Sequence, residues 1–269
     1  MISRKYAKVF EIGLQNTFVY RWNFFLRACF GLVPLLGTVF IWGAIFEAKG
    51  GSAFNDFDYS SVIFYFLLVM FLDGLITPAD DEWQVAAEIR DGLINNFLIK
   101  PVSYLPYRFC LFSSARILYT VVTLPVLVVI FFVFRQYVHW PGRPEIWVCA
   151  GVSVGMAALL QFLISFCVAM LAFWMLEIST VVFILYSFEY FLSGHLFPLG
   201  LFPAWIQRLL AFSPFPYELY FPIAVFQQKV DGVAAYRGLA IQAFWVLAMA
   251  VAAQGLWNRG LRKYQAVGG

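Results

Sequence analysis

Long apolar stretches occupy most of the 269 residues, and several are long enough to cross a lipid bilayer as helices. A hydrocarbon core of roughly 30 Å needs about 20 residues, because each helical residue rises about 1.5 Å. Spanning β-strands alternate apolar and polar residues, whereas these stretches are apolar on every side. Because 62% of the chain is hydrophobic and 12% is charged, we expect an all-α integral membrane protein with a single transmembrane domain over residues 1–269. Six transmembrane helices are predicted, over residues 24–46, 59–78, 105–134, 146–174, 178–197 and 239–258.

The distribution of Lys and Arg predicts the orientation of these helices. With an even number of spans both termini lie on one side, and twelve of the eighteen Lys and Arg fall on that side. Cytoplasmic loops are rich in Lys and Arg, so we expect a multi-pass protein with both termini in the cytoplasm. The formal net charge of +3 is too small to indicate nucleic acid binding.

The first polar segment, residues 1–23, precedes the first span. Residues 3–17 place Arg4 and Lys8 on one helical stripe and Tyr6 and Phe10 on another. This pattern predicts an amphipathic helix that lies in the cytoplasmic interface of the membrane. Two roles are open for this helix: a basic membrane anchor and a specific docking site.

The second polar segment, residues 80–101, connects the second and third spans. Acidic residues stand at a helix start and Arg90 stands just before Gly92, which fits the helix dipole and a left-handed residue after the helix end. A second short piece follows over residues 93–99. We therefore expect a compact cytoplasmic elbow between two spans.

The third segment, residues 198–237, lies between the last two spans. It is rich in aromatic residues but is interrupted by five prolines within residues 198–222. A stretch that is apolar yet broken is typical of short helices that re-enter the membrane where protein covers the freed backbone groups. We expect short re-entrant helices in the outer leaflet.

Four motifs in this order carry a family resemblance: EIRDGL at residues 88–93, LIKP at 98–101, LSGHLFP at 192–198 and WNRGLRKY at 257–264. Together with the spans they resemble an ABC-2-type ATP-binding-cassette exporter permease over essentially the whole chain. The last motif is similar to one subfamily, which is usually found as two permeases with one ATPase.

The resemblance implies that the elbow is a coupling helix that docks into a separate ATPase. The docking region would comprise Glu88, Ile89, Arg90, Gly92 and Leu93, with Ile89 and Leu93 as an apolar ridge. The alternative is that these residues only cap and solubilise a loop.

The resemblance also implies the partners. The sequence has no Gly-x-x-x-x-Gly-Lys-Ser/Thr phosphate loop, so ATP and Mg would be bound by the partner, and this chain would bind no cofactor and catalyse no reaction itself. Two cytoplasmic ABC ATPase subunits and a second permease, identical or homologous, would complete the complex in the bacterial cytoplasmic (inner) membrane. The expected transport is outward export of an amphiphilic or lipid-linked substrate or a drug.

Ionisable residues at membrane depth are costly and often functional, and Glu189 is the clearest such residue. We expect a substrate path lined by four residues on nearby turns: Tyr186, Glu189, Tyr190 and His195. Glu189 could instead pair with an Arg of this chain or of a partner chain in a purely structural role. We expect Asp73 to lie at an interface and Arg116 to reach the cytoplasmic boundary of the membrane.

Two other classes of protein are possible. An intramembrane acyl- or glycosyl-transferase could use Glu189 and His195 as an acid–base pair, although six positions on one helix place them on different faces. A non-catalytic membrane assembly subunit is the second. The four cysteines have neither zinc nor redox spacing, and two histidines are too few for a metal cluster, so we expect no metal site.

Overall fold

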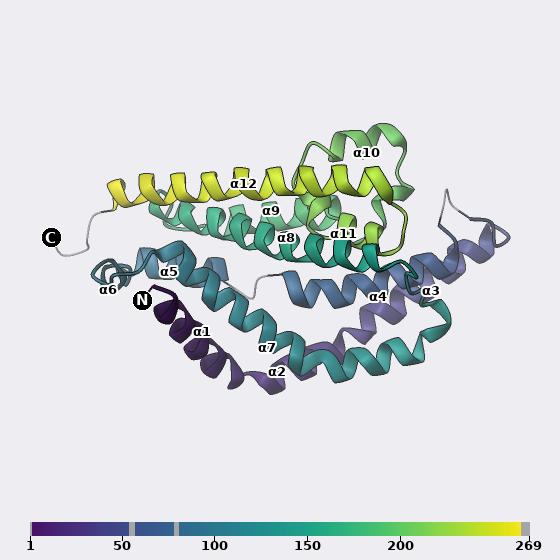
Figure 1. The fold of residues 1–269 in the computed structure, drawn as a ribbon, viewed down its shortest axis with the longest axis horizontal. Helices are drawn as coiled ribbons and strands as arrows, with labels where there is room; N and C mark the ends of the chain where they lie inside the picture. The colour runs from purple at the N-terminus through teal and green to yellow at the C-terminus, as the bar shows by residue number, and fades with distance from the viewer. Residues whose placement is uncertain (1, 54–56, 78–80, 265–269) are drawn as a thin grey trace.

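The computed structural model describes residues 2–53, 57–77 and 81–264, which form helices and no β-strand (Figure 1). The predicted all-α class is therefore confirmed. The α-helices are α1 (Ile2–Phe18), α2 (Arg21–Phe30), α3 (Leu32–Ala48), α4 (Tyr59–Ile76), α5 (Asp81–Arg90), α6 (Asn95–Leu98), α7 (Tyr104–Val133), α8 (Pro144–Ala169), α9 (Ser179–Leu192), α10 (Ala204–Leu210), α11 (Tyr220–Phe226) and α12 (Gly232–Lys263). The 3₁₀ helices are η1 (Arg135–Tyr137), η2 (Met170–Phe173), η3 (Leu199–Leu201) and η4 (Phe215–Tyr217).

Within the described residues, five segments are long and apolar enough to cross a membrane. They match five of the predicted spans, and they support a multi-pass membrane protein. These segments are Arg21–Ala48 (α2 with α3), Tyr59–Ile76 (α4), Tyr104–Val133 (α7), Pro144–Phe173 (α8 with η2) and Gly232–Lys263 (α12).

The fifth predicted span, residues 178–197, contains a shorter helix. Helix α9 has 14 residues, which corresponds to about 21 Å of rise. It ends before Gly194, whose φ of 100° is strained for residues with a side chain. The Tyr65 hydroxyl donates a hydrogen bond of 2.7 Å to the Gly194 carbonyl and fixes this turn. The six-span layout is therefore not confirmed at this position.

The turn between η2 and α9 is stabilised by Glu177. The Ser179 amide donates a hydrogen bond of 3.0 Å to the Glu177 carboxylate. Hydrogen bonds from the Ser179 side chain and amide hold the pKa of Glu177 below its ordinary value. The chain therefore turns between residues 174 and 178 and begins a new helix, as the length of the apolar stretch predicts.

Helix α8 is the centre of the bundle and packs against α4, α5, α11 and α12. Because it has neighbours on several sides, buried residues occur on every face of its second half. Hydrogen bonds of Gln242 join α12 to α8 and η4: Ser153 donates to the Gln242 side-chain oxygen over 2.9 Å, and the Gln242 amide donates to the Ser153 and Tyr217 carbonyls. The helix that runs through the core is thus held in register by a satisfied buried amide.

The two predicted cytoplasmic segments lie at one end of the molecule. Helices α1, α5 and α6 gather there with the C-terminal end of α12, while α10 and the end of α3 lie at the opposite end (Figure 1). Helix α1 runs along α7, where Gly13 allows close approach to Ser114. The predicted interfacial position of α1 and the orientation of the termini stay predictions.

The segment between α9 and α12 consists of the short helices η3, α10, η4 and α11, which fits the proline-interrupted sequence. Helix α11 packs on α8 and buries Phe221 and Ile223. Its re-entry into the outer leaflet stays a prediction.

Candidate functional site

The elbow forms the two short helices that the sequence indicates. Helix α5 ends at Arg90, and Gly92 follows with a φ of 74°. The Ile94 amide then donates to the Glu88 carbonyl over 3.0 Å, which closes the turn before α6 begins. The left-handed residue expected at Gly92 is confirmed, and it reverses the chain toward α7.

The Glu88 side chain on the elbow is hydrogen-bonded to other residues of this chain. Its carboxylate accepts hydrogen bonds from the Tyr104 hydroxyl over 2.5 Å and from the Arg108 guanidinium over 3.1 Å. Both donors are on the first turns of α7, and Arg108 is buried. The contact fastens α5 to α7 next to the membrane span.

The apolar ridge expected from Ile89 and Leu93 is wrong for Ile89. Only 4% of Ile89 is exposed, because it packs into a cluster with Val85, Ile94 and Phe97 and with residues of α8, η2 and α12. Leu93, in contrast, is 53% exposed. Ile89 therefore supports the elbow from inside, since the same apolar stripe faces the bundle.

Several exposed residues of the elbow lie around the turn and at the end of α6. Arg90 and Asp91 form an exposed ion pair of 3.2 Å. Three large apolar side chains that follow in the sequence are also exposed: Leu93, Leu98 and Ile99. We call Arg90, Asp91, Leu93, Leu98 and Ile99 the elbow surface. Sequence reasoning missed Leu98 and Ile99 as contact candidates, although their position beside Lys100-Pro101 marks the end of the short second helix.

A second group of contacts ties the elbow to the far end of the chain. The Tyr104 ring stacks on Trp257 of α12 with centroids 4.6 Å apart and planes 8° apart. Trp257 also meets Phe173 of η2 edge to face. The elbow is thus held against α7, η2 and α12 together.

A cavity of about 670 Å³ lies between α2, α3, α4, α5, α7, α8 and α9. Its lining includes all four residues expected on a substrate path: Tyr186, Glu189, Tyr190 and His195. The first three come from α9, and His195 comes from the turn after it. The structure brings the four residues together on one cavity, and their contact with substrate stays a prediction.

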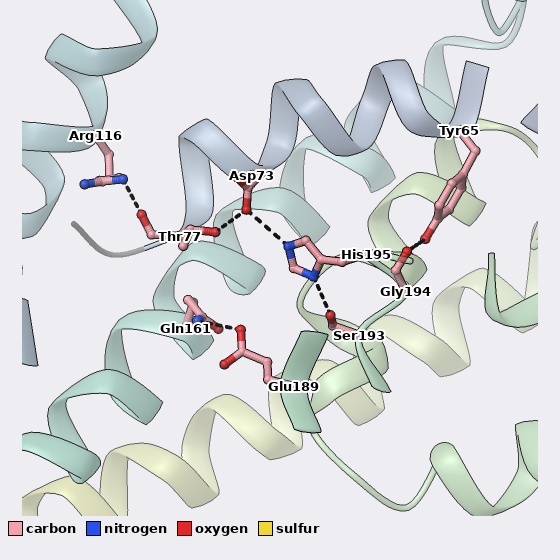
Figure 2. A network of polar contacts seen from close by, with 9 residues as sticks. All are labelled: Tyr65, Asp73, Thr77, Arg116, Gln161, Glu189, Ser193, Gly194 and His195. Carbon is pink, nitrogen blue, oxygen red and sulfur yellow. Dashed lines mark hydrogen bonds and ion pairs between the residues drawn. The ribbon is translucent and has the colours of Figure 1, made fainter. Parts of the chain in front are cut away.

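Glu189 is buried and accepts a hydrogen bond of 2.8 Å from the Gln161 amide of α8 (Figure 2). Its second oxygen, Oε2, has no hydrogen-bond partner in the structure, nor has the Gln161 Oε1. Within the described residues the hydrogen-bond partner of Glu189 is this amide and not an arginine, and pairing with an arginine of a partner chain stays a prediction. Gln161 was not foreseen, although a glutamine inside an otherwise apolar span is a visible signal.

His195 connects the end of α9 to α4. Its Nε2 lies 3.1 Å from the Asp73 carboxylate, and its Nδ1 lies 2.7 Å from the Ser193 hydroxyl (Figure 2). The same Asp73 oxygen accepts a hydrogen bond of 2.6 Å from Thr77. Asp73 lines the cavity, so it lies at a contact between segments of this chain.

Arg116 connects α7 to the end of α4. It is 7% exposed and donates a hydrogen bond to the Thr77 carbonyl at the end of α4 (Figure 2). The guanidinium thus binds a carbonyl that α4 offers where it ends beside α7, and its position relative to the membrane boundary stays a prediction. This contact was invisible in the sequence, since 39 residues separate the two partners.

The paired acid–base chemistry of a transferase receives no support from these contacts. Glu189 binds Gln161, while His195 binds Asp73 and Ser193. In the described part of the chain, no group of three or more His, Cys, Asp or Glu is arranged to hold a metal ion. The cavity is therefore equipped for binding, with polar groups spread over several walls.

Helix α5 connects the cavity to the elbow surface. Glu82 in its first turn is buried, lines the cavity and accepts a hydrogen bond of 3.0 Å from Ser165 of α8. Arg90 at its other end belongs to the elbow surface. Glu82 and Arg90 are eight positions apart on α5, so about 12 Å of helix separates the cavity from the exposed elbow.

A family model described as "ABC-2 family transporter protein" matches residues 32–268, which is most of the chain. None of the curated proteins matches it.

Proposed function

Because the chain belongs to the ABC-2 family of transporters, whose members work with an ATPase, we propose that it is the permease subunit of an ATP-driven exporter. The observation that carries this proposal is helix α5. It contributes Glu82 to the cavity and Arg90 to the elbow surface. A movement imposed on the elbow is therefore transmitted to a cavity wall through one rigid helix.

The elbow surface is the proposed ATPase contact. It combines the exposed apolar side chains of Leu93, Leu98 and Ile99 with the charge of Arg90. Contact surfaces of this kind bury an apolar centre and keep charges at the rim. Behind it, Ile89 and Glu88 fix the elbow to the bundle, so a push on the surface moves α5 as a unit.

ATP chemistry belongs to the partner in this proposal. The sequence has no phosphate loop of the Gly-x-x-x-x-Gly-Lys-Ser/Thr type, so ATP and Mg would be bound by two cytoplasmic ABC ATPase subunits. The elbow end, which also carries α1 and the end of α12 (Figure 1), would then face the cytoplasm, and export would run toward the opposite end. A bacterial cytoplasmic membrane is the proposed location.

A second permease chain, identical or homologous, would complete the path. Helix α9 exposes Phe183, Phe188 and Phe191. Its Tyr186 and Tyr190 line both the cavity and a neighbouring apolar groove that also includes Phe183 and Phe191. One wall of the cavity is therefore a helix with an uncovered outer face, which favours closure by another membrane chain or by lipid. An amphiphilic substrate suits a cavity with polar groups and apolar walls.

The test is co-purification of the ATPase with a tagged permease. Leu93→Asp combined with Ile99→Asp should abolish association, because a charge would be buried without a partner in the contact. Val233→Asp is the matched control, since Val233 is as exposed as Ile99. It stands in the first turn of α12, at the end opposite the elbow, where an acid is tolerated. Unchanged ATPase recovery with the double variant would refute the proposed contact.

A further inference from the structure

The inner wall of the cavity has hydrogen-bond acceptors that lack donors. Glu189 is 6% exposed and Gln161 is 1% exposed. Among the residues that the structure describes, neither the Glu189 Oε2 nor the Gln161 Oε1 has a hydrogen-bond partner. Buried polar atoms are normally paired, so two such atoms on adjacent residues that line one cavity indicate that the cavity's occupant completes them.

The hydrogen-bonding chemistry of Gln161 and Glu189 determines which of their atoms remain without a partner. A carboxylate only accepts hydrogen bonds, so the Gln161 side chain turns its NH₂ group to Glu189. This leaves the amide carbonyl of Gln161 and the second carboxylate oxygen of Glu189. The carboxylate oxygen carries negative charge and the neutral amide oxygen a partial negative charge, and both are suited to a cation or to N–H donors.

Acidic side chains outnumber Lys and Arg among the described residues that line the cavity. Three carboxyl groups line it, from Asp73, Glu82 and Glu189, against one Arg or Lys among the described lining residues, Arg27. Asp73 stands on α4, opposite α9, with 44% of its side chain accessible. An anionic headgroup would meet carboxylates on two walls, which costs several kcal/mol for like charges brought together.

Aromatic side chains surround these carboxylates. The lining includes Phe66, Phe71, Trp83, Tyr119, Tyr186 and Tyr190. Aromatic faces attract organic cations through their quadrupole and also accept apolar groups. The volume of about 670 Å³ falls within the range of pockets that hold one drug-sized molecule.

We propose that this cavity binds a lipophilic organic cation of drug size, with its positive centre against Glu189 and Gln161 and its apolar part between α4, α7 and α9. This inference rests on the proposed export function and names its substrate class. An ammonium ligand would also donate hydrogen bonds to both free acceptors. Neutral and anionic amphiphiles lack the charge that the carboxylates require.

The experiment compares two probes of equal shape and opposite charge. Tetraphenylphosphonium and tetraphenylborate are equilibrated with the complete complex in nanodiscs of neutral lipid, and empty nanodiscs give the background. We expect saturable binding of the phosphonium and none of the borate. Preferential binding of the borate, or no saturable binding of the phosphonium, would overturn the proposal.

Variants locate the binding site. Glu189→Gln should weaken phosphonium binding about tenfold or more, since it removes the charge from a desolvated pair. Glu47→Gln, an exposed acid at the end of α3, should leave binding unchanged. Tyr190→Leu, which removes an aromatic face from the partly exposed side of α9, should weaken binding severalfold and gives a reading if Glu189→Gln does not assemble. Undiminished binding by assembled Glu189→Gln, or by Tyr190→Leu when Glu189→Gln does not assemble, would overturn the proposal.

The two proposals fail separately. Recovery of the ATPase with the permease measures the elbow contact and is independent of the probe. If the ATPase co-purifies but the phosphonium does not bind, the substrate class is wrong and the export function stands. If the phosphonium binds but the ATPase is not recovered, the export function fails and with it the reading of the bound cation as a substrate.

Discussion

The carboxylate of Glu88 on α5 lies 3.1 Å from the guanidinium of Arg108 on α7, and only 4% of the Arg108 side chain is exposed. This ion pair crosses from the elbow to a membrane span. Tyr104 donates to the other Glu88 oxygen and stacks on Trp257, so one carboxylate links three helices. A contact of this kind keeps α5 from rotating independently of the bundle.

Glu88→Gln should therefore loosen the elbow. The amide keeps the shape but removes the charge beside a buried guanidinium, and we expect a loss of about 1–3 kcal/mol, below the cost of breaking a fully buried pair because Glu88 is 33% exposed. The measurement is thermal unfolding of the purified complex. Asp91→Asn is the matched control: its pair with Arg90 is half exposed, and its loss should cost no more than about 0.5 kcal/mol. Equal effects of the two changes would show that the Glu88–Arg108 pair has no special role.

Gly92 gives a second prediction, about the turn. Its φ of 74° suits Gly and tolerates Asn, whereas a β-branched residue is strained there. A side chain would find space, since the nearest atom to an added Cβ is the Tyr264 hydroxyl at 3.6 Å. Gly92→Val should thus cost about 1–3 kcal/mol of backbone strain and reduce ATPase recovery, while Gly92→Asn should retain it. Similar recovery with both variants would mean that the turn conformation does not control docking.

The orientation can be tested by thiol labelling. With the native cysteines replaced, a cysteine at Ser52 or Val233 should react with an impermeant reagent added outside intact cells, whereas one at Gln84 should react only after permeabilisation. Ser52 is exposed shortly after α3, Val233 is exposed in the first turn of α12, and Gln84 is exposed on α5; the end of α3 and α5 lie at opposite ends of the bundle (Figure 1). The physical reason is the excess of Lys and Arg on the elbow side. Labelling of Gln84 in intact cells would reverse the topology and remove the elbow from ATPase reach.

What the sequence predicts well here depends on local signals. The long spans follow from the length of apolar stretches, and the turn at Gly92 follows from an Arg and a Gly at the end of a short helix. Partners distant in the chain do not follow. Glu88 and Arg108 are 20 positions apart, and Gln161 and Glu189 are 28 apart, so each contact depends on how the helices pack.

Ile89 is a second example of a contact that the sequence alone does not predict. Its spacing indicates an apolar stripe on α5, but a stripe does not say whether it faces a partner protein or the bundle. The packing of α5 on α8 and η2 decides this, and it places Ile89 inside. The exposed residues that remain are near the turn, where the sequence pattern is too short to reveal them.

The Gln161–Glu189 pair gives the last prediction, which separates a binding role for Glu189 from a structural pair with an arginine. Glu189→Gln should leave an assembled complex with near-normal stability, because an amide pair can replace the hydrogen bond and no arginine loses its partner. Gln161→Leu should be worse, by about 1–3 kcal/mol or more, since it leaves a buried carboxylate without its donor. The double change Gln161→Leu with Glu189→Leu removes both polar groups and should recover part of the loss. Melting temperatures and yields of the four complexes test this order. If Glu189→Gln is the least stable of them, Glu189 pairs with a cation of another chain, and its role is structural.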